Sequence, residues 1–465
     1  FNSFNFIVLF PLIFLLYYAI PAKYQKARNL FLLVVSYLLY LQWKPVFALI
    51  LLGVTAVTYA AALQMGISKS RKRVLVVGVA TALLPLLFFK YFNFLNDSIS
   101  ELLDVLRLSF HLPGLNWAIP VGISFYTFQA LAYLFDVYYK KQEAERNFLA
   151  YALFVSFFPS ILMGPINRAS VMLPQIKNLR QYFNYAKAVE GLKMILWGMF
   201  MKVVVADRVG LHVDKVLDFY EAYSGITCFI ASIMYSVQIY ADFGGYSLMA
   251  IGVGKTLGFE MRNNFRRPFF AHSVSDYWTR WHLSFSSWLK DYVYIPLGGS
   301  RRGKYRTYWN IFVTFLVSGI WHGANWTFIL WGMWHSVCII LERMFNQQKC
   351  RYGAAGRTIK IIIAFMLVNF SRILFHMPTV TDAWNVMAKI FSVDMMTDFV
   401  RPSLSTMFFV LVLFVKDALD EFYPNRFHLI SHRSAVVRWS TYVILILVIM
   451  LEGVLGADTF IYANF

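Results

Sequence analysis

Charged residues are scarce in this chain. They make up 14% of its 465 residues, whereas a soluble domain carries about 25%. Hydrophobic residues make up 59% and aromatic residues 18%. This composition excludes a soluble enzyme, a disordered chain and a repeat protein with polar faces. It indicates an integral membrane protein.

Cysteine and the common catalytic motifs are also scarce or absent. The three cysteines, Cys228, Cys338 and Cys350, have neither metal-site spacing nor a disulfide pattern, and we interpret them as packing thiols. No Walker loop, Gly-x-Ser-x-Gly elbow, His-Glu-x-x-His or Cys-x-x-Cys motif occurs, and no acidic pair indicates glycoside hydrolysis. The remaining chemistry is acid–base catalysis by histidine in a membrane cavity.

Long apolar stretches recur along the whole chain. A spanning helix needs about 20 mostly apolar residues. Thirteen stretches approach this length: 4–20, 29–43, 46–65, 74–89, 119–138, 148–165, 186–206, 226–241, 307–323, 326–345, 359–377, 404–421 and 440–456.

Basic residues alternate between the connecting segments. One set of segments holds 31 of the 43 Lys and Arg residues, and the opposite, more acidic set holds 7. The basic set is therefore predicted to be cytoplasmic, which also explains the net charge of +19 better than nucleic-acid binding does. The alternation holds only if two stretches enter the membrane and return without crossing it. These are 148–184, which is broken at Gly164-Pro165, and the glycine-rich stretch 242–258. Re-entrant backbone implies an internal cavity.

Together these patterns predict an all-α polytopic membrane protein. We expect about 11 transmembrane helices, two re-entrant segments and cytoplasmic interfacial helices, folded as one domain over residues 1–465. Membrane lipid is then an obligatory partner.

Segment 259–306 is the least membrane-like part of the chain. Residues 273–293 have helical character, with Ser273 as a candidate N-cap and Asp276 completing an acidic capping box. Its Trp and basic residues suit a helix in the membrane interface, and a plain cytoplasmic anchor is one interpretation. The other is functional, because His282 lies at its centre beside Arg280 and Trp281.

A glycine-rich basic loop follows this segment. Arg301 and Arg302 lie between Gly299 and Gly303, and Lys304 follows. The glycines would let the backbone approach an anion. The loop is either a seat for the phosphates of an acyl donor or only a cytoplasmic marker of topology.

His322 is the stronger histidine candidate. It ends one apolar stretch beside the small residues Gly319, Gly323 and Ala324. A histidine inside an apolar span is a functional candidate, because burial there is costly unless the ring is paired or hydrated. His335, 13 residues on, is expected to pack or hydrogen-bond.

Asp242 opens the glycine-rich stretch. It is predicted to cap the N-terminus of a half-helix, or alternatively to orient a histidine or bind substrate hydroxyls.

Six long motifs in consistent order carry a family resemblance. The chain resembles the membrane-bound O-acyltransferases, within them the bacterial branch of the alginate O-acetylases and, more distantly, the D-alanine transfer proteins of teichoic acid synthesis. The matching motifs are SFYTFQALAYLFDVYY (124–139), FVSFFPSILMGPINR (154–168), YADFGGYSLMAIGVGKTLGF (240–259), NNFRRPF (263–269), YWTRWHLSFSSWLKDYVYIPLGGSRRG (277–303) and SGIWHGANWTFILWGMWH (318–335). The family core is thus 120–345, with peripheral helices in 1–119 and 346–465.

The resemblance implies acyl transfer to a hydroxyl. It matches His322 to the family's catalytic histidine and His282 to a second functional histidine, within a ring of helices around a funnel or tunnel. We expect His322 to act as general base, the indole and backbone N–H groups from Trp321 to Asn325 to hold the oxyanion, and His282 to position the donor or relay a proton.

The resemblance also implies the reaction partners. It implies a multi-pass protein of the bacterial inner membrane with no permanently bound cofactor or metal, and no nucleic acid as partner. The donor is expected to be a cytoplasmic thioester, acetyl-coenzyme A or an acyl-carrier protein. The acceptor is expected to be an exported polysaccharide, a cell-wall polymer or a partner protein, and an extracytoplasmic transferase is a plausible partner.

Two other functions fit the same residues. A polysaccharide or lipid transporter would also have broken helices and the intramembrane Asp242. A non-catalytic scaffold for a separate acyltransferase would depend on surface loops and not on His322.

Overall fold

The computed structural model describes residues 4–108, 113–115, 117–178, 182–345, 353–392, 399–424 and 429–454. These residues form helices and loops without a strand, which confirms the all-α prediction. Cys350 lies outside them. The chain divides into two compact units, an N-terminal unit (7–191 and 253–262) and a C-terminal unit (1–6, 192–252 and 263–465), while the single domain stays a prediction.

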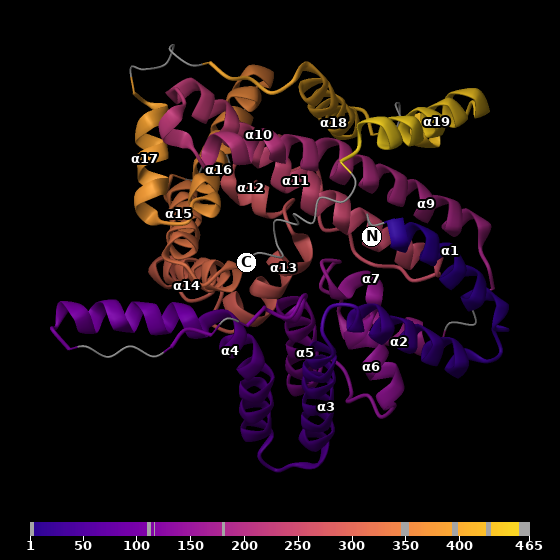
Figure 1. Ribbon diagram of the computed structural model, residues 1–465. Helices are drawn as coiled ribbons and strands as arrows, with labels where there is room; N and C mark the ends of the chain where they lie inside the picture. The colour runs from indigo at the N-terminus through magenta and orange to yellow at the C-terminus, as the bar shows by residue number, and fades with distance from the viewer. Residues whose placement is uncertain are drawn as a thin grey trace. The chain divides into compact units, whose positions relative to one another are not determined.

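The N-terminal unit is a bundle in which α3 packs against both α4 and α5 (Figure 1). Helix α4 extends beyond its apolar stretch through an acidic segment. The helices are α1 (Phe4–Ala19), α2 (Gln25–Leu41), α3 (Pro45–Ile67), α4 (Arg71–Val105), α5 (Ile123–Tyr138), α6 (Phe148–Ser156), α7 (Phe158–Ile161), α8 (Ala169–Asn178) and the start of α9 (Tyr185–Met199).

The predicted broken helix at 148–165 is present, but it breaks earlier than expected. Helix α6 ends at Ser156, and α7 adds a single turn before the loop that contains Gly164 and Pro165. Phe157, with φ −54° and ψ 108°, leaves the helical region between the two.

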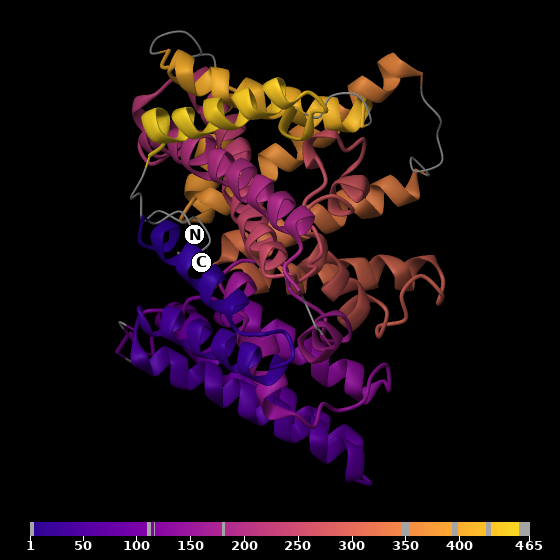
Figure 2. The same ribbon diagram turned by 90° about the vertical axis from the view of Figure 1, so that its right-hand side faces the viewer.

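The C-terminal unit contains the remaining helices. Helices α18 and α19 both pack against the π-helix η1 (Figure 2). The elements are η1 (Phe200–Ala206), α10 (Asp207–Leu217), η2 (Tyr220–Ala222), α11 (Gly225–Thr256), η3 (Pro268–Phe270), α12 (Val274–Trp278), α13 (Leu283–Leu289), η4 (Lys290–Tyr294), α14 (Lys304–His322), α15 (Trp326–Met344), α16 (Ala354–His376), α17 (Val380–Ile390), α18 (Leu404–Phe422), η6 (Leu429–Ser431) and α19 (Ala435–Glu452).

The predicted separate segment at 242–258 is wrong. Helix α11 runs without interruption from Gly225 to Thr256. The glycines of this stretch serve close packing: a Cβ at Gly245 would lie 2.6 Å from the carbonyl oxygen of Gly198. Small residues let two helix backbones approach, and here they form a contact face in place of a helix break.

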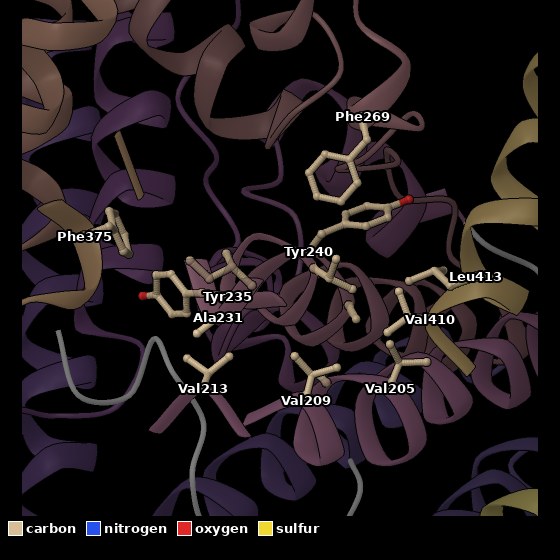
Figure 3. Packing of buried hydrophobic residues seen from close by; sticks show 14 of the residues in the cluster. Val205, Val209, Val213, Ala231, Tyr235, Tyr240, Phe269, Phe375, Val410 and Leu413 are labelled. Carbon is tan, nitrogen blue, oxygen red and sulfur yellow. The ribbon is translucent and has the colours of Figure 1, made fainter. Parts of the chain in front are cut away.

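A hydrophobic cluster joins η1, α10, α11 and α18 (Figure 3). Val213 lies beside Ala231 of α11, and Val205 lies beside Val410 of α18. Tyr240 reaches toward Phe269, with ring centroids 5.1 Å apart. The cluster fixes the α11 face on which the candidate site rests.

Five described helices are long and apolar enough to cross a membrane. They are Pro45–Ile67, Arg71–Val105, Gly225–Thr256, Ala354–His376 and Ala435–Glu452. Their number supports a multi-pass membrane protein, whereas the count of about 11 stays a prediction.

Candidate active site

The expected helix 273–293 is interrupted at its centre. Ser273 accepts a hydrogen bond from the Asp276 amide, which confirms the predicted N-cap. However, α12 ends at Trp278 and α13 begins only at Leu283. His282, the residue directly before α13, has φ 43° and ψ 54°, a left-handed conformation that an uninterrupted helix cannot contain.

The interrupted segment packs against residues 263–267, and its position in the membrane interface stays a prediction. Its backbone bonds to residues 263–267: the Arg266 amide donates to the Arg280 carbonyl, and the Leu283 amide donates to the Asn264 carbonyl, both at 2.9 Å. These two bonds satisfy backbone groups that have no helical hydrogen bond, and they hold His282 away from the surface.

His282 is enclosed by protein. Its side chain belongs to a residue that is 1% exposed, and its ring lies 4.7 Å from Phe243 and 5.1 Å from Phe285. Burial lowers the pKa of His282 to about 3, so the ring is neutral near pH 7. Its Nδ1 lies 3.4 Å from Asn264 Oδ1, which also accepts from the Ser284 amide. Because that oxygen can only accept, Nδ1 carries the proton and Nε2 keeps its lone pair.

His322 is the last residue of α14. Helices α14 and α15 lie side by side at very close range (Figure 1). A Cβ at Gly319 would lie 2.3 Å from the Phe328 carbonyl oxygen, and one at Gly332 would lie 2.3 Å from that of Phe315. Glycine on both helices therefore sets the spacing that places His322 against α15.

His322 lines a small, mostly aromatic cavity. The cavity has a volume of about 20 Å³, enough for about one water molecule. Its other lining residues are Ile239, Tyr277, Trp281, Trp331, His335, Val368, Arg372 and Phe375.

The two candidate histidines, 40 positions apart in sequence, are neighbours in space. Both contact the stacked pair formed by Phe285 and Trp321, whose ring centroids are 4.0 Å apart. Ring-centroid distances to Phe285 are 5.1 Å for His282 and 5.9 Å for His322. About one aromatic layer therefore separates the two imidazoles.

A larger polar cavity lies on the side of His282. It offers about 250 Å³ and is bordered by Asn264, the histidine's hydrogen-bond partner. Trp281 contacts Phe265 of this cavity, at 4.8 Å between centroids, and also lines the small cavity. The remaining lining residues are Trp197, Met201, Tyr240, Gly244, Ser247, Leu248, Ile251, Asn263, Arg266, Arg267, Lys416, Asp417 and Asp420.

Asp242 does not cap a half-helix, because it lies inside α11. Its Oδ1 lies 2.7 Å from Lys202 Nζ, which also binds Asp207 Oδ1 at 2.7 Å. All three side chains are buried. The structure therefore gives Asp242 a cationic partner, and the prediction of a cap is wrong.

Arg280 and Asn325 have structural partners. Arg280 binds Asp276 at 3.0 Å and Glu421 at 2.9 Å. Burial tends to raise the pKa of the Asp276 carboxyl, but the hydrogen bond and charge of Arg280 outweigh it and hold that pKa below its usual value. Asn325 caps α15 through Thr327 and donates to the Pro378 carbonyl.

The basic loop stands apart from both cavities. Arg301, Arg302 and Lys304 are exposed and line neither. Their role in binding a phosphorylated donor stays a prediction.

Two residues that line the small cavity, Tyr277 and Arg372, are not among the site residues predicted from the sequence. Tyr277 lies in the same motif as His282, and Arg372 is a charged residue within the apolar stretch 359–377. Such an intramembrane charge is itself a functional signal. His335 hydrogen-bonds with Trp278 and Ser371, as expected, yet it also lines the small cavity.

Comparison with known proteins identifies the class. The family model of the membrane-bound O-acyltransferases matches residues 139–381, which include both histidines and all lining residues of the small cavity. The chain belongs to this family and is an O-acyltransferase.

Several curated proteins are similar along most of the chain. The probable alginate O-acetylase of Pseudomonas aeruginosa is 36% identical over 84% of this chain and 75% of its own length. The peptidoglycan O-acetyltransferase of Helicobacter pylori is 33% identical, covering 83% and 79%. The teichoic acid D-alanyltransferase of Bacillus subtilis is 25% identical, covering 64% and 76%.

Proposed function

We propose that this protein transfers a short acyl group, an acetyl group by preference, from a cytoplasmic thioester to a hydroxyl outside the membrane. The acceptor is an exported polysaccharide, a cell-wall polymer or a partner protein. Support comes from the relatives, whose names specify O-acetylation of alginate and peptidoglycan and D-alanylation of teichoic acid.

One observation carries the proposal: two histidines lie within about one aromatic layer of each other, and each meets a different cavity. His282 reaches the larger cavity through Asn264. His322 lines the small one directly. A donor that binds in the larger cavity would therefore need to pass its thioester by the layer of Phe285 and Trp321 to meet the acceptor hydroxyl at His322.

His322 acts as the general base. It accepts the proton of the acceptor hydroxyl while the hydroxyl oxygen attacks the thioester carbonyl carbon. The carbonyl electron pair moves to oxygen, and the tetrahedral intermediate then expels the thiolate, which takes the proton from His322. The products are an ester and a free thiol, with no net proton consumed.

His282 positions the donor. Burial lowers the pKa of His282, which makes its ring a weak base, and His282 does not line the small cavity, so we assign proton transfer to His322. The lone pair on Nε2 is suited to accept a hydrogen bond, for example from an amide of a pantetheine arm. This arm occurs in both coenzyme A and acyl-carrier proteins, and no permanently bound cofactor is required.

The membrane setting follows from the charge pattern. The larger cavity includes residues of 263–267 and 416–420, which belong to the basic segments, so donor entry is from the cytoplasm. We place the protein in a bacterial inner membrane, with an extracytoplasmic transferase as partner where the acceptor is a polymer.

The test is a transfer assay with purified protein in lipid nanodiscs, labelled acetyl-coenzyme A or acetylated carrier protein, and alginate oligosaccharide as acceptor. His322→Ala should lower turnover by about 10²–10⁴-fold, the usual contribution of a general base. His282→Ala should act mainly on the KM of the donor.

The matched control is His272→Ala, an exposed histidine that lines neither cavity. It should retain wild-type turnover. Full activity of His322→Ala would contradict the mechanism. Normal polymer export in His322→Ala cells, with the same acylation as in wild-type cells, would favour a transporter.

A further inference from the structure

Arg372 shares the small cavity with His322. It lies on α16, and only 4% of the residue is exposed. Its guanidinium lies over the Trp281 ring, 4.3 Å from the ring centroid. The acyl-transfer mechanism proposed above does not use this residue.

The partners of Arg372 are all neutral. Its Nη2 donates to the Tyr277 hydroxyl at 2.5 Å, and its Nη1 donates to the Ser236 carbonyl at 3.4 Å. Among the described residues, no carboxylate lies within 4.0 Å of its guanidinium nitrogens. By contrast, Arg280 binds two carboxylates.

A buried cation without a counter-ion is costly for the fold. Guanidinium has five N–H donors, and the two bonds above leave the others available. The cavity beside it has room for about one water-sized atom. The arrangement is therefore prepared for a small group that carries negative charge, such as a single oxygen.

We propose that Arg372 is a catalytic residue that stabilises the oxyanion of the tetrahedral intermediate formed at His322; this rests on the function proposed above. As the hydroxyl oxygen bonds to the carbonyl carbon, the carbonyl oxygen becomes negative within the cavity. Arg372 supplies the opposite charge there, and Tyr277 and Trp281 hold the guanidinium in place. When the carbon–sulfur bond breaks, the charge leaves with the thiolate and the oxygen returns to a neutral carbonyl.

The test compares Arg372→Ala with the wild type in the transfer assay. Loss of an oxyanion donor lowers kcat by about 10²–10³-fold, and the donor KM should stay within about threefold. Added guanidinium ion should restore part of kcat, whereas urea, which has the same planar shape without charge, should not. Arg208→Ala is the matched control, because Arg208 binds Glu452 on another part of the unit. It should retain wild-type kcat.

Each outcome bears on the proposal. Wild-type kcat in Arg372→Ala, or equal rescue by urea and guanidinium, would overturn it. If Arg372→Ala does not fold, Arg372→Lys is compared with Arg372→Gln, and equal kcat in these two would overturn it as well. His322→Ala is measured in parallel. If His322→Ala is active, the proposed function fails. If His322→Ala is inactive while Arg372→Ala is active, only the role of Arg372 fails.

Discussion

The two histidines differ because their surroundings differ. His282 is a left-handed residue between two short helices, with its Nδ1 proton directed to Asn264. His322 ends a long helix and faces a cavity with room for an oxygen atom. We therefore separate their tasks, assigning donor positioning to the first and proton transfer to the second.

The neutral state of His282 has a consequence for stability. Its pKa is about 3 in the folded protein and about 6.5 when unfolded, so the unfolded chain binds the extra proton between these values. Stability is thus fully retained above pH 6.5 and falls as the pH drops toward 3. At pH 5 the loss from this group is about 2 kcal/mol relative to pH 7.

The measurement is the unfolding temperature in detergent between pH 7 and pH 4. His282→Gln should reduce the acid-side fall. An identical pH dependence in wild type and His282→Gln would mean that His282 is not buried as a neutral ring.

Among the elements, the α14–α15 pair is the one that places His322. Gly332→Ala would bring a methyl group within 2.3 Å of the Phe315 carbonyl oxygen, so the helices must separate. We expect a loss of about 1–3 kcal/mol in stability, with lower acyl transfer because His322 moves. Thermal unfolding and turnover check this. The control Gly53→Ala, in α3 with nothing within 4 Å of the new Cβ, should be neutral or slightly stabilising. Equal behaviour of the two variants would contradict the account.

The contact between η1 and α11 depends on a buried ionic triad. Lys202 binds two carboxylates, Asp207 and Asp242, that would otherwise lie inside the protein without a cation. Removing the shared cation should cost about 3–5 kcal/mol. Lys202→Met should therefore accumulate less folded protein than Asp242→Asn, which leaves an ammonium–carboxylate pair. Fluorescence-detected size-exclusion chromatography measures this, and the reverse order would show that the triad is not held by Lys202.

Much of the element pattern could be predicted from the sequence. Long apolar stretches gave helices close to their expected ends, as in α3 and α15, and the Ser273 cap followed from residue type and spacing. The continuity of α11 could not be predicted, because glycine favours both a break and a close helix contact. Only the partner helix decides between them. The larger cavity could not be predicted either, because part of its lining comes from α18, which is far away in the sequence.

For the whole molecule, the positive charge of the loops predicts which side of the membrane each loop occupies. Charge counting places Ser300 in the cytoplasm and Ala222 outside. Cys228 and Cys338 are buried, so a Cys350→Ser background should label weakly. In intact cells, a membrane-impermeant thiol reagent should label Ala222→Cys but not Ser300→Cys, and permeabilisation should expose both. Labelling of Ser300→Cys in intact cells would invert the topology.

The central claim is that an acyl group passes from one face of the membrane to the other at His322. The most direct measurement uses sealed vesicles with the cytoplasmic face outward, labelled acetyl donor outside and an oligosaccharide acceptor trapped inside. The account predicts that labelled ester accumulates inside with the wild type and not with His322→Ala. Transfer only to acceptor added on the donor's side, or undiminished transfer by His322→Ala, would contradict it.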